Sequence, residues 1–188
     1  MRTFQSTFAR WYNGTFDRRG RYWADRFKST LLGNHRAVLD CLLYIELNAV
    51  RARLCTRPEE YKSSSIYLRE IKQDKWLMPL KDLLGAKTKK AALLEFKARL
   101  YYRGGVPTKG NQHVIPNEII KAEADRGFKS RGVYRKRVGY FVDGIALGAE
   151  EFVENIILEL RERGVYRHEK NPKKIKEGYF MSVRAGSQ

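Results

Sequence analysis

The stretch Tyr44-Ile-Glu-Leu-Asn48-Ala-Val-Arg51-Ala52 has the pattern of a helix that carries a polar stripe on an apolar surface. At about 100° per residue, its tyrosine, asparagine and arginine fall with Asp40 within a wedge of roughly 80°. Most other side chains between residues 38 and 54 are apolar, so we expect this helix to be packed on several sides. The stripe then faces either a satisfied hydrogen-bond network or a working site. As a site it offers a nucleophile and, one turn later, a metal ligand, which suits attack on a phosphodiester.

The net charge is the strongest global signal in the sequence. The chain of 188 residues carries a formal charge of +17, and its pI is near 10.0. Such an excess favours a polyanionic partner, most simply nucleic acid. A hydrophobic content of 43% can build a core, and the length fits one domain or a domain with a small appendage.

The sequence has no signal for a membrane or for secretion. It lacks a run of about 18 apolar residues, a lipidation motif and the apolar segment of a secretory signal. Cys41 and Cys55 do not form a CxxC pair, and His35, His113 and His168 are isolated, so no zinc spacing occurs. We expect both cysteines to pack as small apolar residues, which agrees with a reducing compartment. The expected location is cytoplasmic, without membrane contact.

Periodicity and breakers predict the remaining elements. The tyrosine helix should begin after Gly33-Asn34 and end near residue 54, and residues 104–110 read as a flexible connection. We further predict helices over 2–12, 77–84, 89–102, 116–123 and 149–163, a β-rich segment over 21–32, a short turn over 57–61 and a short strand over 140–148.

Three separated motifs occur in a fixed order within residues 1–65. They read Gly20-Arg-Tyr-Trp23-Ala-Asp-Arg26-Phe-Lys28, then the tyrosine stretch, then Pro58-Glu-Glu-Tyr61-Lys-Ser-Ser64. Together they resemble the single-tyrosine HUH transposases, and in particular the REP-associated tyrosine transposases. The segment 138–153 also looks like the C-terminal portion of longer members of that family.

The resemblance implies a mechanism. In that family a tyrosine hydroxyl attacks a phosphodiester of single-stranded or hairpin DNA and leaves a 5′-phosphotyrosine link and a free 3′-OH. Mg²⁺ polarises the phosphate, held by a His-hydrophobe-His motif and a polar residue one turn after the tyrosine. Tyr44 matches the nucleophile and Asn48 the third metal ligand, and residues i and i+4 share a helix face. Family members act as dimers, so a homodimer is a further expectation.

The chain departs from the family pattern at the metal site. No His-hydrophobe-His occurs in it, and Met1 aligns after the strand that carries this motif in the family. We therefore expect an α+β, mostly helical fold. An incomplete ferredoxin-like HUH transposase domain would span residues 1–65 and keep one strand. A helical, basic C-terminal region would span 66–188, with an alternative boundary near 104–116. Asn48 alone would not hold Mg²⁺, so we expect no cleavage by the chain alone.

Aromatic and basic residues mark the expected DNA contacts. Rings beside cations suit single-stranded DNA, and eight basic and two acidic residues precede Ala37. The predicted contacts are Arg18, Arg19, Arg21, Trp23, Arg26, Lys28, Arg51, Arg131, Arg135, Lys136 and Arg137.

Plainer interpretations remain open for these residues and for the chain. Trp23 and Phe27 could be core residues of an amphipathic strand, the basic stretch 126–137 could be a solvated loop, and Arg51 could pair with Asp40. For the chain, the alternatives to an enzyme are a non-catalytic nucleic-acid-binding remnant and a basic protein that binds acidic partners.

Overall fold

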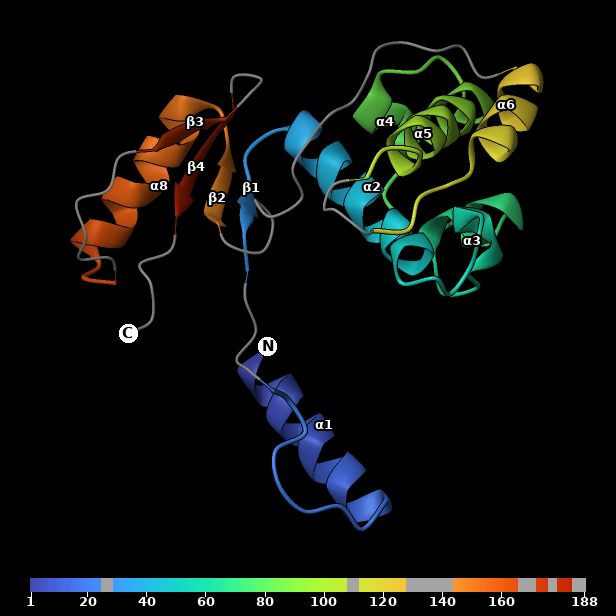
Figure 1. The fold of residues 1–188 in the computed structure, drawn as a ribbon. Helices are drawn as coiled ribbons and strands as arrows, with labels where there is room; N and C mark the ends of the chain where they lie inside the picture. Colours follow the sequence, from blue (N-terminus) through green and yellow to red (C-terminus); the bar gives the residue numbers. More distant parts are fainter. Residues whose placement is uncertain (25–28, 108–111, 128–143, 166–171, 176–178, 184–188) are drawn as a thin grey trace.

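The computed structural model describes residues 1–24, 29–107, 112–127, 144–165, 172–175 and 179–183. The fold is α+β and mostly helical (Figure 1). Its elements in chain order are α1 (Arg2–Thr15), β1 (Leu31–Leu32), α2 (His35–Arg51), η1 (Pro58–Glu60), α3 (Ser65–Glu70), α4 (Leu80–Leu84), α5 (Lys89–Gly104), α6 (Asn117–Asp125), β2 (Gly144–Gly148), α8 (Glu150–Glu162), β3 (Lys173–Ile175) and β4 (Tyr179–Val183).

The main core lies between α2 and α5. Leu43, Leu47 and Val50 of α2 are almost fully buried, and they pack in one cluster with Phe96 and Leu100 of α5. Spacings of three and four residues put these side chains on one face of each helix, so the two apolar stripes meet. The shorter helices α3, α4 and α6 surround this pair (Figure 1).

The described strands form one sheet in the order β1-β2-β4-β3. β1 pairs with β2 in parallel, and β4 pairs antiparallel with both β2 and β3. Helix α8 packs on this sheet through Val153 and Ile157, which cluster with Ala146 of β2. Figure 1 shows the sheet and α8 on one side of α2 and the helices α4, α5 and α6 on the other.

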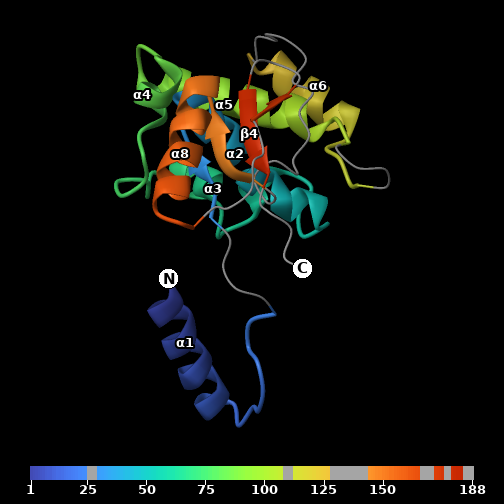
Figure 2. The same cartoon turned by 90° about the vertical axis from the view of Figure 1, so that its left-hand side faces the viewer.

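Helix α1 stands apart from the rest of the molecule. It has no buried residue, and Figure 1 and Figure 2 show it without another labelled helix or strand beside it. The segment 20–24 returns along α1, where Trp23 Nε1 donates a hydrogen bond of 3.0 Å to the backbone oxygen of Gln5. Rings of Phe8, Tyr12 and Tyr22 pack within this small hairpin at centroid distances between 4.6 and 6.0 Å.

Several predicted boundaries were wrong. The first helix does not end at residue 12 but runs to Thr15, and the tyrosine helix ends at Arg51 rather than near 54. The C-terminal region is not purely helical, because β2, β3 and β4 all lie within it. The expectation that α2 is packed on several sides is confirmed, since eight of its residues are buried, although Ile45 is 54% exposed.

Other predicted elements are confirmed. The helices expected at 116–123 and 149–163 correspond to α6 and α8, the turn at 57–61 contains η1, and α5 covers the helix expected at 89–102. Within the described ranges, we find no helix that is both long and apolar enough to cross a bilayer.

Candidate functional site

Helix α2 positions the polar stripe at the edge of the buried face. The helix begins after Asn34, whose side-chain oxygen accepts a hydrogen bond of 2.8 Å from the backbone N–H of Ala37. Asp40 is 6% exposed, Tyr44 and Arg51 are half-buried, and Asn48 is exposed. Asp40 thus lies in the core, whereas Tyr44, Asn48 and Arg51 reach the surface of the same helix to different degrees.

Arg51 and Asp40, near opposite ends of the stripe, have different partners. The guanidinium carbon of Arg51 lies 5.9 Å from the centroid of the Tyr44 ring, a distance at which cation–π attraction operates. Asp40 Oδ1 accepts a hydrogen bond of 2.9 Å from Nη1 of Arg103, which α5 supplies. A direct Asp40–Arg51 pair was the alternative from sequence. The structure bonds Asp40 to Arg103 and lays the guanidinium of Arg51 near the Tyr44 ring instead.

Asn48 opens onto a different surface, a groove of about 440 Å³ beside α2. Its walls are largely apolar and include Ile45, Leu54 and Trp76. The one carboxylate that lines it, Glu46, is already engaged, since it accepts hydrogen bonds from the backbone N–H groups of Ser65 and Ile66 at 3.2 and 3.3 Å.

The residues around Asn48 do not fit a Mg²⁺ site. Over the ranges that the structure describes, no three His, Cys, Asp or Glu side chains come together in a group that could hold a metal. Mg²⁺ prefers near-octahedral oxygen coordination with carboxylates or waters, and a single amide oxygen on an apolar wall does not provide it.

A second candidate surface lies on the α1 hairpin. Residues of α1 and of the segment 20–24 line a groove of about 590 Å³. Its lining includes Arg2 from α1 and Arg21, Tyr22 and Trp23 from the returning segment. Trp23 is 38% exposed, so the ring that holds the hairpin together also presents a face to solvent. Cations flanking exposed rings are the combination that binds single-stranded nucleic acid.

Three predicted DNA contacts, Arg18, Arg19 and Arg21, are exposed on this hairpin. The guanidinium carbon of Arg18 lies 5.7 Å from the ring centroid of Tyr12 and 6.0 Å from that of Tyr22. The structure thus brings four of the predicted contacts, Trp23 among them, into one hairpin, whereas Arg51 lies on α2. The predicted contacts Arg26, Lys28, Arg131, Arg135, Lys136 and Arg137 lie outside the described residues.

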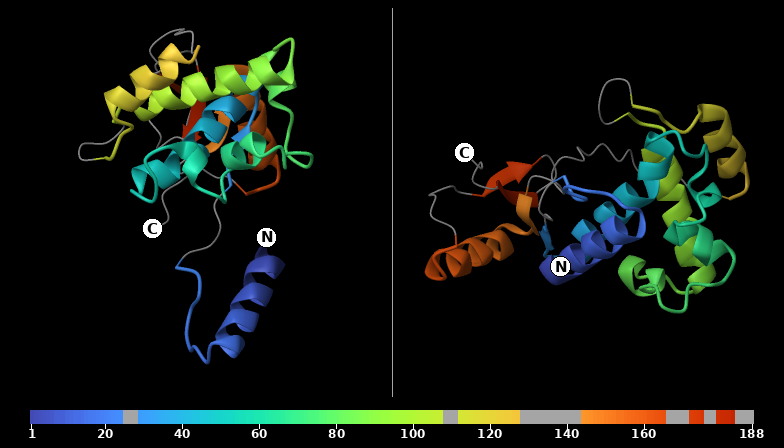
Figure 3. Two further views of the ribbon diagram at one scale, coloured as in Figure 1. Left: turned by 90° about the vertical axis from the view of Figure 1, so that its right-hand side faces the viewer. Right: turned by 90° about the horizontal axis from the view of Figure 1, so that it is seen from below.

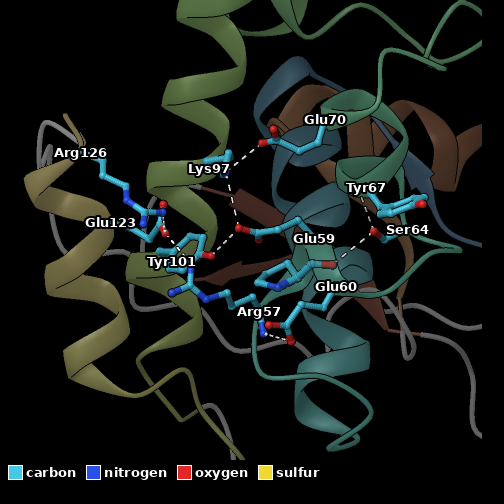
Figure 4. Close-up of polar contacts among 11 residues, drawn as sticks. Arg57, Glu59, Glu60, Ser64, Tyr67, Glu70, Lys97, Tyr101, Glu123 and Arg126 are labelled. Carbon is cyan, nitrogen blue, oxygen red and sulfur yellow. Dashed lines mark hydrogen bonds and ion pairs between the residues drawn. The ribbon is translucent and has the colours of Figure 1, made fainter.

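The most extensive cluster of charged side chains is structural. Figure 4 shows it at the junction of η1, α3, α5 and α6, where Glu59, Glu70 and Glu123 each face a cation or a hydroxyl. Lys97 Nζ lies 2.8 Å from Glu70 Oε1, and Arg57 Nη1 lies 2.6 Å from Glu123 Oε1. Glu123 also pairs with Arg126 at 2.8 Å.

Tyr101 completes this junction through a hydrogen bond of 2.7 Å from its hydroxyl to Glu59 Oε1. Burial and this hydrogen bond raise the pKa of the Tyr101 phenol far above its usual range. The phenol therefore stays protonated and is a poor nucleophile. Its role is to fasten η1 to α5.

The two thiols lie where small apolar residues were expected. Cys41 and Cys55 are free and half-buried, and Cys55 packs against the main core. Burial raises the pKa of both thiols, with Asp40 adding to the effect at Cys41 and Glu60 and Glu59 at Cys55. Neither thiol has the lowered pKa of a reactive cysteine.

Two residues of these surfaces did not emerge from the sequence analysis. Arg103 lies seven residues after Phe96 and three after Leu100, so it lies on the apolar face of α5. A cation on an apolar stripe was the signal that could have found it. Arg2 gave no such signal, because only the return of residues 20–24 along α1 brings it beside Trp23.

Comparison of the chain with protein-family models, curated proteins and solved structures gives no match.

Proposed function

We propose that this protein binds single-stranded DNA through the groove of the α1 hairpin. The observation that carries the proposal is the groove itself, which two arginines line together with the rings of Tyr22 and Trp23. The guanidinium groups would contact phosphates and the Trp23 ring would stack on a base, an arrangement that tolerates any sequence. The charge of +17 supports the same class of partner.

Substitution of Trp23 tests this proposal. A base stacked on an aromatic ring contributes about 1–3 kcal/mol, so Trp23→Leu should weaken binding of an oligothymidine by roughly 5- to 150-fold. Trp23→Phe keeps a ring but lacks the indole N–H that bonds Gln5, and it should retain most of the affinity. Fluorescence anisotropy of a labelled oligonucleotide measures both variants.

The matched control is Trp76→Leu. Trp76 is 76% exposed but lies outside the α1 hairpin, so its loss should leave DNA affinity unchanged. Equal affinities for the parent, Trp23→Leu and Trp76→Leu would contradict the proposed groove. A loss with Trp23→Phe as large as with Trp23→Leu would show that the hydrogen bond matters and not the stacking ring.

A second candidate function is DNA strand transfer with Tyr44 as the nucleophile, as the sequence resemblance implies. Its support in the structure is the position of Tyr44 on α2, half-buried beneath the guanidinium of Arg51 and one turn before the exposed Asn48. Since the residues around Asn48 do not fit Mg²⁺, two histidines from another polypeptide segment or subunit would be needed to complete the metal site.

Incubation with hairpin DNA and Mg²⁺ distinguishes the two functions. The chain alone should form no covalent adduct with a DNA strand, as judged by denaturing electrophoresis, while still shifting the DNA in a native gel. An adduct that is lost in Tyr44→Phe would contradict this expectation and establish strand transfer by this chain. Trp23→Leu serves as the control that weakens binding without touching Tyr44.

A further inference from the structure

Helix α1 carries an aromatic stripe, Phe4, Phe8 and Trp11, that the returning segment covers only in part. At 100° per residue the three side chains fall within about 60° of one another. The ring centroid of Phe8 lies 6.2 Å from that of Phe4 and 5.5 Å from that of Trp11. Phe8 also contacts Tyr22 and Trp23, but Phe4 and Trp11 are 60% and 58% exposed. None of the three stripe residues lines the proposed DNA groove, so the stripe lies on a face that DNA is not expected to use.

The groove beside α2 is an apolar concave surface whose composition differs from that of the chain. Ile45, Leu54 and Trp76 line it, and each is more than half exposed. Lysine and arginine make up 38 of the 188 residues, yet neither occurs among the described residues that line this groove. The carboxylate of Glu46 is already bonded to the first turn of α3. The groove therefore suits an apolar, uncharged occupant rather than a phosphate backbone.

The aromatic stripe of α1 has the chemistry of such an occupant. Thr7 and Thr15, its neighbours on the helix surface, are uncharged. The two arginines of α1, Arg2 and Arg10, lie about 120° or more around the helix from Phe4. Helices with an apolar face are commonly recognised by apolar grooves. In this structure α1 does not fill the groove of its own chain, since none of its residues is buried.

Exchange of α1 between two copies of the chain would bury enough surface for a stable interface. At roughly 200 Å² per aromatic side chain, the exposed parts of Phe4, Trp11 and Trp76 amount to about 400 Å². Ile45 and Leu54 add about 100 Å². A twofold dimer makes this contact twice and so buries about 1,000 Å², the size that a specific interface should reach. We propose that the aromatic stripe of α1 docks in the groove beside α2 of a second copy, and that the two copies exchange this contact reciprocally.

This docking does not rest on the proposed DNA-binding function, and salt separates the two. DNA binding should weaken as the KCl concentration is raised. Association of two chains that each carry a charge of +17 should instead strengthen, because salt screens their repulsion and the contact itself is apolar. Trp11→Ser should therefore weaken association while it leaves the affinity for a short oligothymidine unchanged.

Sedimentation velocity of the full chain over a range of concentrations tests the docking. The parent protein should dimerise in a concentration-dependent way. Trp11→Ser and Trp76→Ser should each raise the dissociation constant at least about tenfold, because each removes a ring from both contacts. Trp76 lies outside α1, so its variant leaves the α1 hairpin intact. Leu158→Ser is the matched control, since Leu158 is similarly exposed on α8 and belongs to neither surface, and its dimer should persist.

A mixture of the two tryptophan variants identifies the surfaces that meet. In a mixed dimer the intact stripe of Trp76→Ser occupies the intact groove of Trp11→Ser. The mixture should therefore associate more tightly than either variant alone. A parent protein that stays monomeric at every concentration would overturn the proposal, and so would a mixture no tighter than the separate variants. Loss of the dimer in only one tryptophan variant, or in Leu158→Ser, would also contradict it.

Discussion

At the scale of single residues, Glu46 shows how one side chain joins two elements. It lies on α2 and is 3% exposed, yet its carboxylate accepts hydrogen bonds from the backbone of Ser65 and Ile66 and from the Ser65 hydroxyl. Those N–H groups belong to the first turn of α3, which has no partner for them within the helix. A carboxylate there also complements the positive end of the helix dipole.

Replacement of Glu46 by alanine should destabilise the protein. The change leaves buried N–H donors without an acceptor, so we expect a loss of about 2–3 kcal/mol in the free energy of unfolding. Chemical denaturation of the purified variant measures the loss. Glu154→Ala, which removes an exposed carboxylate from α8, should change stability by less than about 0.5 kcal/mol. Equal effects of the two substitutions would show that Glu46 does not fasten α3.

The sequence predicted the polar stripe but not the partners of its members. Helical spacing was enough to align Tyr44, Asn48 and Arg51, because it depends only on the chain between residues 40 and 51. The pairing of Asp40 with Arg103 joins residues that are 63 positions apart. Such a contact depends on how α2 and α5 pack, which local periodicity does not contain.

At the scale of elements, the amphipathic helices were the most predictable parts of the fold. Helices α5, α6 and α8 have apolar residues at spacings of three and four, and breakers such as Pro116 mark their ends. The strands were harder to predict. β1 has two residues and β3 has three, so neither is long enough to show alternation. They exist because β2 and β4 offer them a pairing edge.

Helix α1 is a different case at this scale. Its aromatic residues predicted a helix, and a helix forms, but none of its side chains is buried. An isolated helix of about this length is marginal in water, so packing of Trp23 and Tyr22 against it has to stabilise the hairpin. The same rings line the proposed DNA groove. The division of the chain near residue 65 stays a prediction.

At the scale of the whole molecule, the basic residues of the helix junction are paired with acids, whereas those near the N-terminus outnumber the acids around them. Acids at the junction of η1, α3, α5 and α6 engage Arg57, Lys97 and Arg126 in ion pairs. Residues 1–24 instead carry five arginines and one aspartate. The left view of Figure 3 shows α1, which carries two of these arginines, apart from the helices that hold these ion pairs. The end of the chain with the exposed rings therefore carries a local net charge of +4, five arginines against one aspartate.

The central claim is that this charge serves to bind single-stranded DNA. The most direct measurement is the affinity for an oligothymidine, by fluorescence anisotropy, as KCl is raised from about 50 to about 200 mM. Each phosphate contact should contribute a slope of about −0.7 to a plot of log K against log salt. If Arg2, Arg21 and a neighbouring arginine each contact one phosphate, we predict a slope of about −2. A slope near zero, or no binding at the lowest salt, would contradict the account.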